Sequence, residues 1–66
     1  MDPSESWTEL SRAIGDNDWQ AAGGRADELL GWLRKGGFPP RITGIEPFDR
    51  IVTRATCESI AAWEWD

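Results

Sequence analysis

The chain has 66 residues, 12 of them acidic and seven basic, and its formal net charge is −5. It contains no histidine and one cysteine, which excludes an internal disulfide, a zinc site and the Ser-His or Cys-His catalytic pairs. General acid–base chemistry would depend on carboxylates alone. We therefore expect a protein that is not an enzyme and that binds no metal or other cofactor.

Length and polarity also bear on location. A chain this short forms one domain, here residues 1–66, with a small core. Its first five residues are acidic and polar, unlike a secretory signal, and no apolar run reaches the roughly 20 residues that cross a bilayer. The expected location is the cytoplasm, without membrane contact.

The first predicted helix spans residues 6–15 and follows a flexible lead at residues 1–5. Ser6 and Glu9 form a capping-box pattern at its start, and a glycine ends the segment. The apolar side of this helix consists of Trp7, Leu10 and Ile14.

The second helix has the strongest periodic pattern in the chain and completes a helical hairpin over residues 6–36. Its apolar positions recur every three or four residues, at Trp19, Ala22, Ala26, Leu29, Leu30 and Leu33. Gly36 and Gly37 supply a left-handed stop, and Phe38 is expected to pack back on the last turn. Gly23 flanks the apolar stripe, which predicts a close approach of the first helix.

An extended link rich in proline and glycine covers residues 37–47, and a third helix is predicted over residues 48–64. As a helix, this segment places on one face Phe48, Ile51, Val52, Ala55, Ser59, Ala62 and Trp63. Cys57 lies on the opposite face, so this helix would expose its thiol. The alternative is a β-hairpin that pairs residues 41–45 with residues 50–56, which the β-branched side chains there favour.

The predicted fold is therefore a small three-helix, all-α domain. The alternative is an α+β arrangement in which a two-helix hairpin precedes the β-hairpin. The 3.6-residue pattern that runs unbroken through the last third of the chain favours three helices.

Tryptophan is the compositional outlier, with five residues against two phenylalanines and no tyrosine. Trp7 and Trp19 fall on the apolar stripes and are expected in the core. Trp32 lies about 100° from the centre of its stripe, so either the third element covers it, which we favour, or it is exposed. Trp63 falls on the third stripe, and Trp65 is expected to stay exposed. Because tryptophan is enriched at binding hot spots, the predicted partner-binding residues are Trp32, Trp63 and Trp65.

Basic residues concentrate in the middle of the chain, where residues 31–54 hold five bases and two acids. The five are Arg34, Lys35, Arg41, Arg50 and Arg54. They are candidate contacts for a nucleic-acid backbone or another anion. The net charge of −5 opposes a polyanion at long range, so nucleic acid is the less favoured partner.

These observations favour a non-enzymatic protein–protein interaction module that docks through its C-terminal tryptophans. Its partner would be another protein or a second copy of itself, as in a self-associating accessory or inhibitor protein of a bacterium or phage. A nucleic-acid-associated protein that uses the mid-chain basic residues is the alternative.

Overall fold

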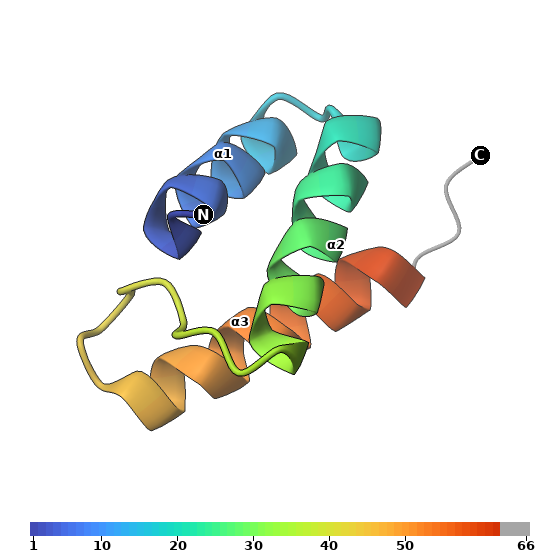
Figure 1. Ribbon diagram of the computed structural model, residues 1–66. Helices are drawn as coiled ribbons and strands as arrows, with labels where there is room; N and C mark the ends of the chain where they lie inside the picture. Colours follow the sequence, from blue (N-terminus) through green and yellow to red (C-terminus); the bar gives the residue numbers. More distant parts are fainter. Residues whose placement is uncertain (63–66) are drawn as a thin grey trace.

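The structure, a computed structural model, describes residues 1–62 and contains three helices in that range (Figure 1). They are α1 (Pro3–Gly15), α2 (Trp19–Arg34) and α3 (Glu46–Ala62). The central helix is α2, because it packs against both of the others, whereas α1 and α3 do not pack on each other. The prediction of a three-helix, all-α fold is confirmed. The β-hairpin alternative is not supported, since residues 41–56 form a loop and a helix.

The first helix begins at Pro3, one turn earlier than predicted, because Asp2 caps it rather than Ser6. The Asp2 carboxylate accepts hydrogen bonds from the backbone N–H groups of Ser4 at 3.0 Å and Glu5 at 3.3 Å. Proline suits the first helical position, where its missing N–H would have had no partner. Residues 3–5 are therefore helical, which corrects the predicted flexible lead, and Ser6 is a buried residue of the first turns.

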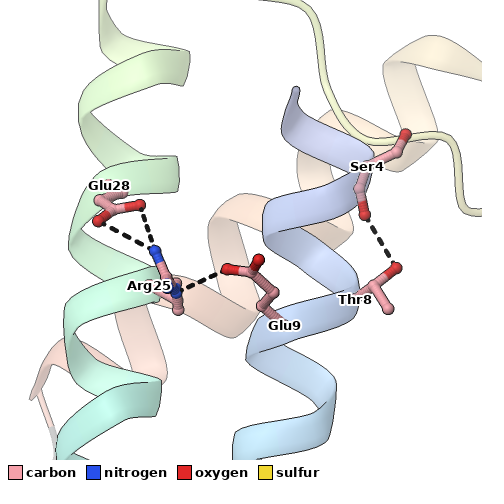
Figure 2. A network of polar contacts seen from close by, with 5 residues as sticks. All are labelled: Ser4, Thr8, Glu9, Arg25 and Glu28. Atoms are coloured by element: carbon pink, nitrogen blue, oxygen red, sulfur yellow. Dashed lines mark hydrogen bonds and ion pairs between the residues drawn. The ribbon is translucent and has the colours of Figure 1, made fainter. Parts of the chain in front are cut away.

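One surface network joins α1 to α2 (Figure 2). Arg25 of α2 contacts Glu9 of α1 at 2.9 Å and Glu28 of its own helix at 3.2 Å. All three side chains are partly exposed, so water and salt screen the attraction and the pairs contribute little stability. The two helices are held together mainly by the apolar side chains between them.

Those apolar side chains come largely from α2. The stripe predicted for this helix is confirmed, since its buried residues are Ala22, Ala26, Leu29, Leu30 and Leu33. The main core cluster also takes Leu10 and Ala13 from α1 and Cys57 and Ile60 from α3. Trp7 and Trp19 are half-buried and pack against this cluster, so their predicted core-facing positions are confirmed. The expected role of Gly23 is wrong, because a Cβ at that position would meet no neighbouring atom within 4 Å.

The glycine pair ends α2 as predicted. The N–H of Gly36 bonds to the Leu33 carbonyl at 3.0 Å, and the N–H of Gly37 bonds to the Trp32 carbonyl at 2.9 Å, which is the Schellman pattern. Gly36 has a φ of +88°, a backbone conformation that side chains rarely adopt. A Cβ at Gly37 would overlap the Trp32 indole. Phe38 packs back on Trp32, with ring centroids 5.7 Å apart and an angle of 83° between the ring planes.

The third helix begins at Glu46, two residues earlier than predicted, and turns a different face to the core. Its buried residues are Asp49, Thr53, Cys57 and Ile60. Phe48 and Ile51, predicted in the core, are 50% and 59% exposed, while Cys57, predicted in solvent, has no exposed surface. Within the same predicted face, Val52 is half-buried, and the exposed positions are Ala55, Ser59 and Ala62. Residues 63 and 64, the last of the predicted helix, lie outside the described part.

Two features explain this rotation of α3. Thr53 and Cys57 are small and fully buried, and Cys57 belongs to the core cluster that contains Ala22 and Ala26 of α2. Asp49 must also face inward, because its carboxylate holds the link that leads into the helix. The buried residues at positions 49, 53, 57 and 60 also have helical spacing. Because Asp49 and Thr53 are polar, a search for apolar periodicity does not detect this stripe.

Candidate interaction surface

The link between α2 and α3 is shaped by Asp49. Its carboxylate accepts hydrogen bonds from the backbone N–H groups of Ile42 (3.2 Å), Thr43 (2.9 Å) and Gly44 (3.1 Å), and from the Thr43 hydroxyl (2.7 Å). Gly44 has a φ of +87°, which lets the loop wrap around the carboxylate. Four donors on one acceptor fix the backbone that carries Ile42 and Ile45.

Two opposing effects set the pKa of Asp49. Burial removes water from the carboxylate and on its own would raise the pKa. The hydrogen bonds from Thr43, Ile42 and Gly44 favour the charged form, and together they outweigh burial, so the pKa lies below its ordinary value. Asp49 is therefore a charged structural anchor at neutral pH.

A gathering of exposed apolar side chains results from this arrangement. Ile45, Phe48 and Ile51 are 62%, 50% and 59% exposed and follow one another at three-residue intervals into α3. We call these three residues the outer face. The link adds Phe38 and Ile42, so five of the six exposed large apolar side chains found among residues 1–62 lie between positions 38 and 51.

The five exposed side chains leave a substantial apolar area in solvent. Each of the five side chains keeps between about a third and two thirds of its area in solvent, which amounts to about 400–500 Å² in all. The largest apolar patch of an ordinary monomer covers about 300–600 Å² and is often functional. Here an area of that size is distributed over residues 38–51 of a chain whose radius of gyration is 11.1 Å.

A second feature lies between α2 and α3. A cavity of about 110 Å³ is lined by Leu30, Leu33, Arg34, Arg50, Arg54 and Glu58. We call it the arginine pocket. Arg50 donates to the Gly37 carbonyl at 2.9 Å, and Arg54 pairs with Glu58 at 3.3 Å. Arg34 has no hydrogen-bond or ion-pair partner among residues 1–62.

The structure thus divides the predicted basic residues. Arg34, Arg50 and Arg54 come together around the pocket although 20 positions of sequence separate the first from the last. Lys35 borders a separate, shallower hollow next to Trp32. Arg41 borders neither cavity, and its backbone N–H bonds to the Ser4 hydroxyl at 3.1 Å.

The predicted partner-binding tryptophans have different outcomes. Trp32 is half-buried, and its indole Nε1–H donates to the Phe38 carbonyl at 2.8 Å, so residues of its own link cover it. Trp32 also borders the hollow that Lys35 lines. Trp63 and Trp65 lie outside the described residues, and their role as partner contacts stays a prediction.

Sequence reasoning missed the outer face because it assigned Phe48 and Ile51 to the core. One signal could have revealed it. The segment Thr43-Gly44-Ile45-Glu46-Pro47-Phe48-Asp49 places an acidic side chain in the first turn of a helix, just after a turn sequence whose N–H groups need an acceptor. An inward Asp49 then forces Phe48 and Ile51 outward.

No protein-family model matches the chain, and no curated protein and no solved structure is significantly similar to it. Among residues 1–62, none of the three helices has the length and apolar character that a membrane span needs. Function must therefore be argued from the outer face and the arginine pocket themselves.

Proposed function

We propose that this protein is a non-enzymatic protein–protein interaction module that docks its partner through the outer face. The observation that carries the proposal is the exposure of Ile45, Phe48 and Ile51 on one side of the start of α3. The same proposal places the protein in the cytoplasm as an accessory or inhibitor protein.

Helical docking provides the physical basis. Apolar side chains spaced three or four residues apart on an exposed helix are the anchors with which one helix packs against a partner helix or groove. Exposure of three large apolar side chains to water is unfavourable. Covering them upon binding would contribute about 25 cal/mol of binding free energy for each Å² of apolar area removed from water. Phe48 and Ile51 are also held on a rigid helix, so little conformational entropy is lost upon docking.

The tryptophans retain a secondary place in the proposal. Trp32 presents only part of its ring to solvent, so its contribution would come from that edge. Trp63 and Trp65 follow α3 directly in the sequence and remain candidate contacts for the same partner.

The test compares the parent protein with a Phe48→Ser/Ile51→Ser double variant and with a control variant, Thr8→Ala/Ser11→Ala, that changes exposed positions of α1. Each protein is immobilised, exposed to native lysate, and any captured protein is purified and titrated. We expect a protein that binds the parent and the control with equal affinity and binds the double variant at least tenfold more weakly. If the double variant, folded by circular dichroism, retains every partner at full affinity, the proposal is wrong.

A further inference from the structure

The outer face and the arginine pocket adjoin each other on α3. At 100° per residue, Ile51 lies about 60° around the helix from Arg54, and Phe48 lies about 120° from it. Arg54 lines the pocket from the flank of the buried side of α3, about 60° from buried Cys57, and Ile51 is the exposed residue on its other side. A segment laid along the outer face would thus have the pocket at its edge.

The pocket carries net positive charge in a chain whose overall charge is negative. Three arginines line it against one acid, Glu58, which Arg54 already engages. Arg34 has donors to spare, since it has no partner among residues 1–62. The planar guanidinium fork matches a carboxylate in two-pronged hydrogen bonds. The buried side chains of Leu30 and Leu33 form an apolar wall beside these arginines.

We propose that the partner presents an acidic amphipathic helix, with apolar side chains on the outer face and one Asp or Glu carboxylate in the arginine pocket. This inference rests on the proposed function and adds to it the chemistry of the partner. The pocket volume of about 110 Å³ equals the space of a few water molecules at about 30 Å³ each, which admits a carboxylate and the methylene next to it.

A second copy of the chain fits this surface poorly. The acids of α1 lie on a surface where residues 1–62 expose no large apolar side chain apart from Met1. Among residues 1–62, Asp27 and Glu28 of α2 do border apolar surface, but they share a hollow with Met1 and Trp32 rather than a projecting apolar stripe. Two-fold pairing of the outer faces would instead bring two sets of pocket arginines toward each other, and like charges at an interface oppose association.

A nucleic-acid strand also fits less well. Strand binding needs cations that track the backbone together with exposed aromatic rings. Arg41 and Lys35 lie apart from the pocket, and Trp32 is half-covered by its own link. The pocket is therefore suited to one anionic group that lies next to an apolar strip.

The experiment uses the full chain as bait for a phage-displayed library of amphipathic 16-residue helices, and the enriched peptides are then synthesised. Affinity is measured by fluorescence anisotropy at 50 and 300 mM salt for the parent and for Arg34→Ala, Arg54→Ala, Ile51→Ser and Arg41→Ala. The last is a matched control, because it removes the same charge at an exposed position outside the pocket. Light scattering measures whether the chain forms a dimer, and titration with a single-stranded DNA 20-mer measures whether it binds nucleic acid.

We expect the enriched peptides to share an acidic residue at one edge of the apolar stripe and to lose affinity as salt rises. Arg34→Ala should weaken binding at least tenfold, Arg54→Ala should weaken it as well, and Arg41→Ala should weaken it less than twofold. Replacing the peptide acid by its amide should weaken binding to the parent but should not further weaken binding to the Arg34→Ala variant.

Enriched peptides that lack an acid and ignore Arg34→Ala would overturn this inference while the proposed function stands. The inference would also be overturned if the DNA strand bound more tightly than the enriched peptides, or if the parent formed a dimer that Ile51→Ser dissociates. If no peptide is enriched, or if Ile51→Ser leaves peptide binding unchanged, the proposed function fails and the inference fails with it.

Discussion

Two isoleucines of α3 give a matched test of which face of the helix is buried. Ile60 is 8% exposed and belongs to the core cluster, whereas Ile51 is 59% exposed. Truncating a buried isoleucine to alanine costs about 2–5 kcal/mol, from lost burial and from the cavity left behind. A domain of this length has a free energy of unfolding of about 3–10 kcal/mol, so Ile60→Ala should remove a large part of its stability.

The exposed position should behave differently. Ile51→Ala removes a side chain that is mostly in water and introduces a better helix former, so the free energy of unfolding should change by less than about 0.5 kcal/mol. Both variants are unfolded in guanidinium chloride and followed by circular dichroism at 222 nm. If Ile60→Ala does not fold, Ile60→Val should still show a loss of about 0.5–1.5 kcal/mol.

The reverse order would refute the reasoning. A loss of about 2 kcal/mol or more for Ile51→Ala, with Ile60→Ala close to the parent, would mean that α3 turns Phe48 and Ile51 to the core. The outer face would then not exist, and neither proposal would have a surface on which to rest.

Three further predictions concern glycines and Asp49. Gly24→Ala should stabilise the protein by about 0.5–1 kcal/mol, because a Cβ there meets no atom within 4 Å in a helix interior; an unchanged urea midpoint would count against this. Gly37→Ala should destabilise it by about 1–3 kcal/mol and shift the tryptophan emission, because the added Cβ overlaps the Trp32 indole; unaltered stability and emission would contradict the packing. Because the pKa of Asp49 is lowered in the folded protein, its contribution to stability is complete above its unfolded-state pKa of about 3.8 and is lost as pH falls below that value. The melting temperature of an Asp49→Asn variant should therefore change less between about pH 5 and 2 than that of the parent. Parallel plots of melting temperature against pH for the two proteins would be inconsistent with this role.

The first two helices were largely predictable from the sequence because their signals are local. The apolar period of α2 and its glycine stop both lie within the segment they determine. The cap of α2 is local too, since the Asp18 carboxylate accepts from the Ala21 N–H at 3.2 Å. The start of α1 was missed because two N-terminal caps compete within five residues, and proline next to Asp2 decides between them.

The orientation of α3 was not predictable from periodicity alone. Two stripes with helical spacing share this segment, one containing Phe48 and Ile51, the other containing Thr53 and Cys57. Hydrophobicity favours the first stripe. The second is buried because of contacts with distant residues, namely the small side chains of α2 and the loop that Asp49 holds.

The candidate site shows the same limit. The sequence identified Arg34, Arg50 and Arg54 as basic residues of the middle zone but could not tell which of the five would meet. Their convergence depends on the crossing of α2 and α3, a tertiary feature. The apolar surface beside them became visible only when the burial of α3 was known.

The central claim is that α3 buries Cys57 and turns its outer face to solvent, and the single cysteine allows a direct measurement. Its side chain has no exposed surface, and burial raises the pKa of the thiol to about 11. At pH 8 about one thiol in 1,000 would be ionised, against about one in ten when unfolded, and only the thiolate attacks a disulfide reagent. The rate of reaction with 5,5′-dithiobis(2-nitrobenzoate) should therefore be at least 100-fold slower in native protein than in 6 M guanidinium chloride. Equal rates in the two conditions would show that Cys57 faces solvent, and that the outer face is the core.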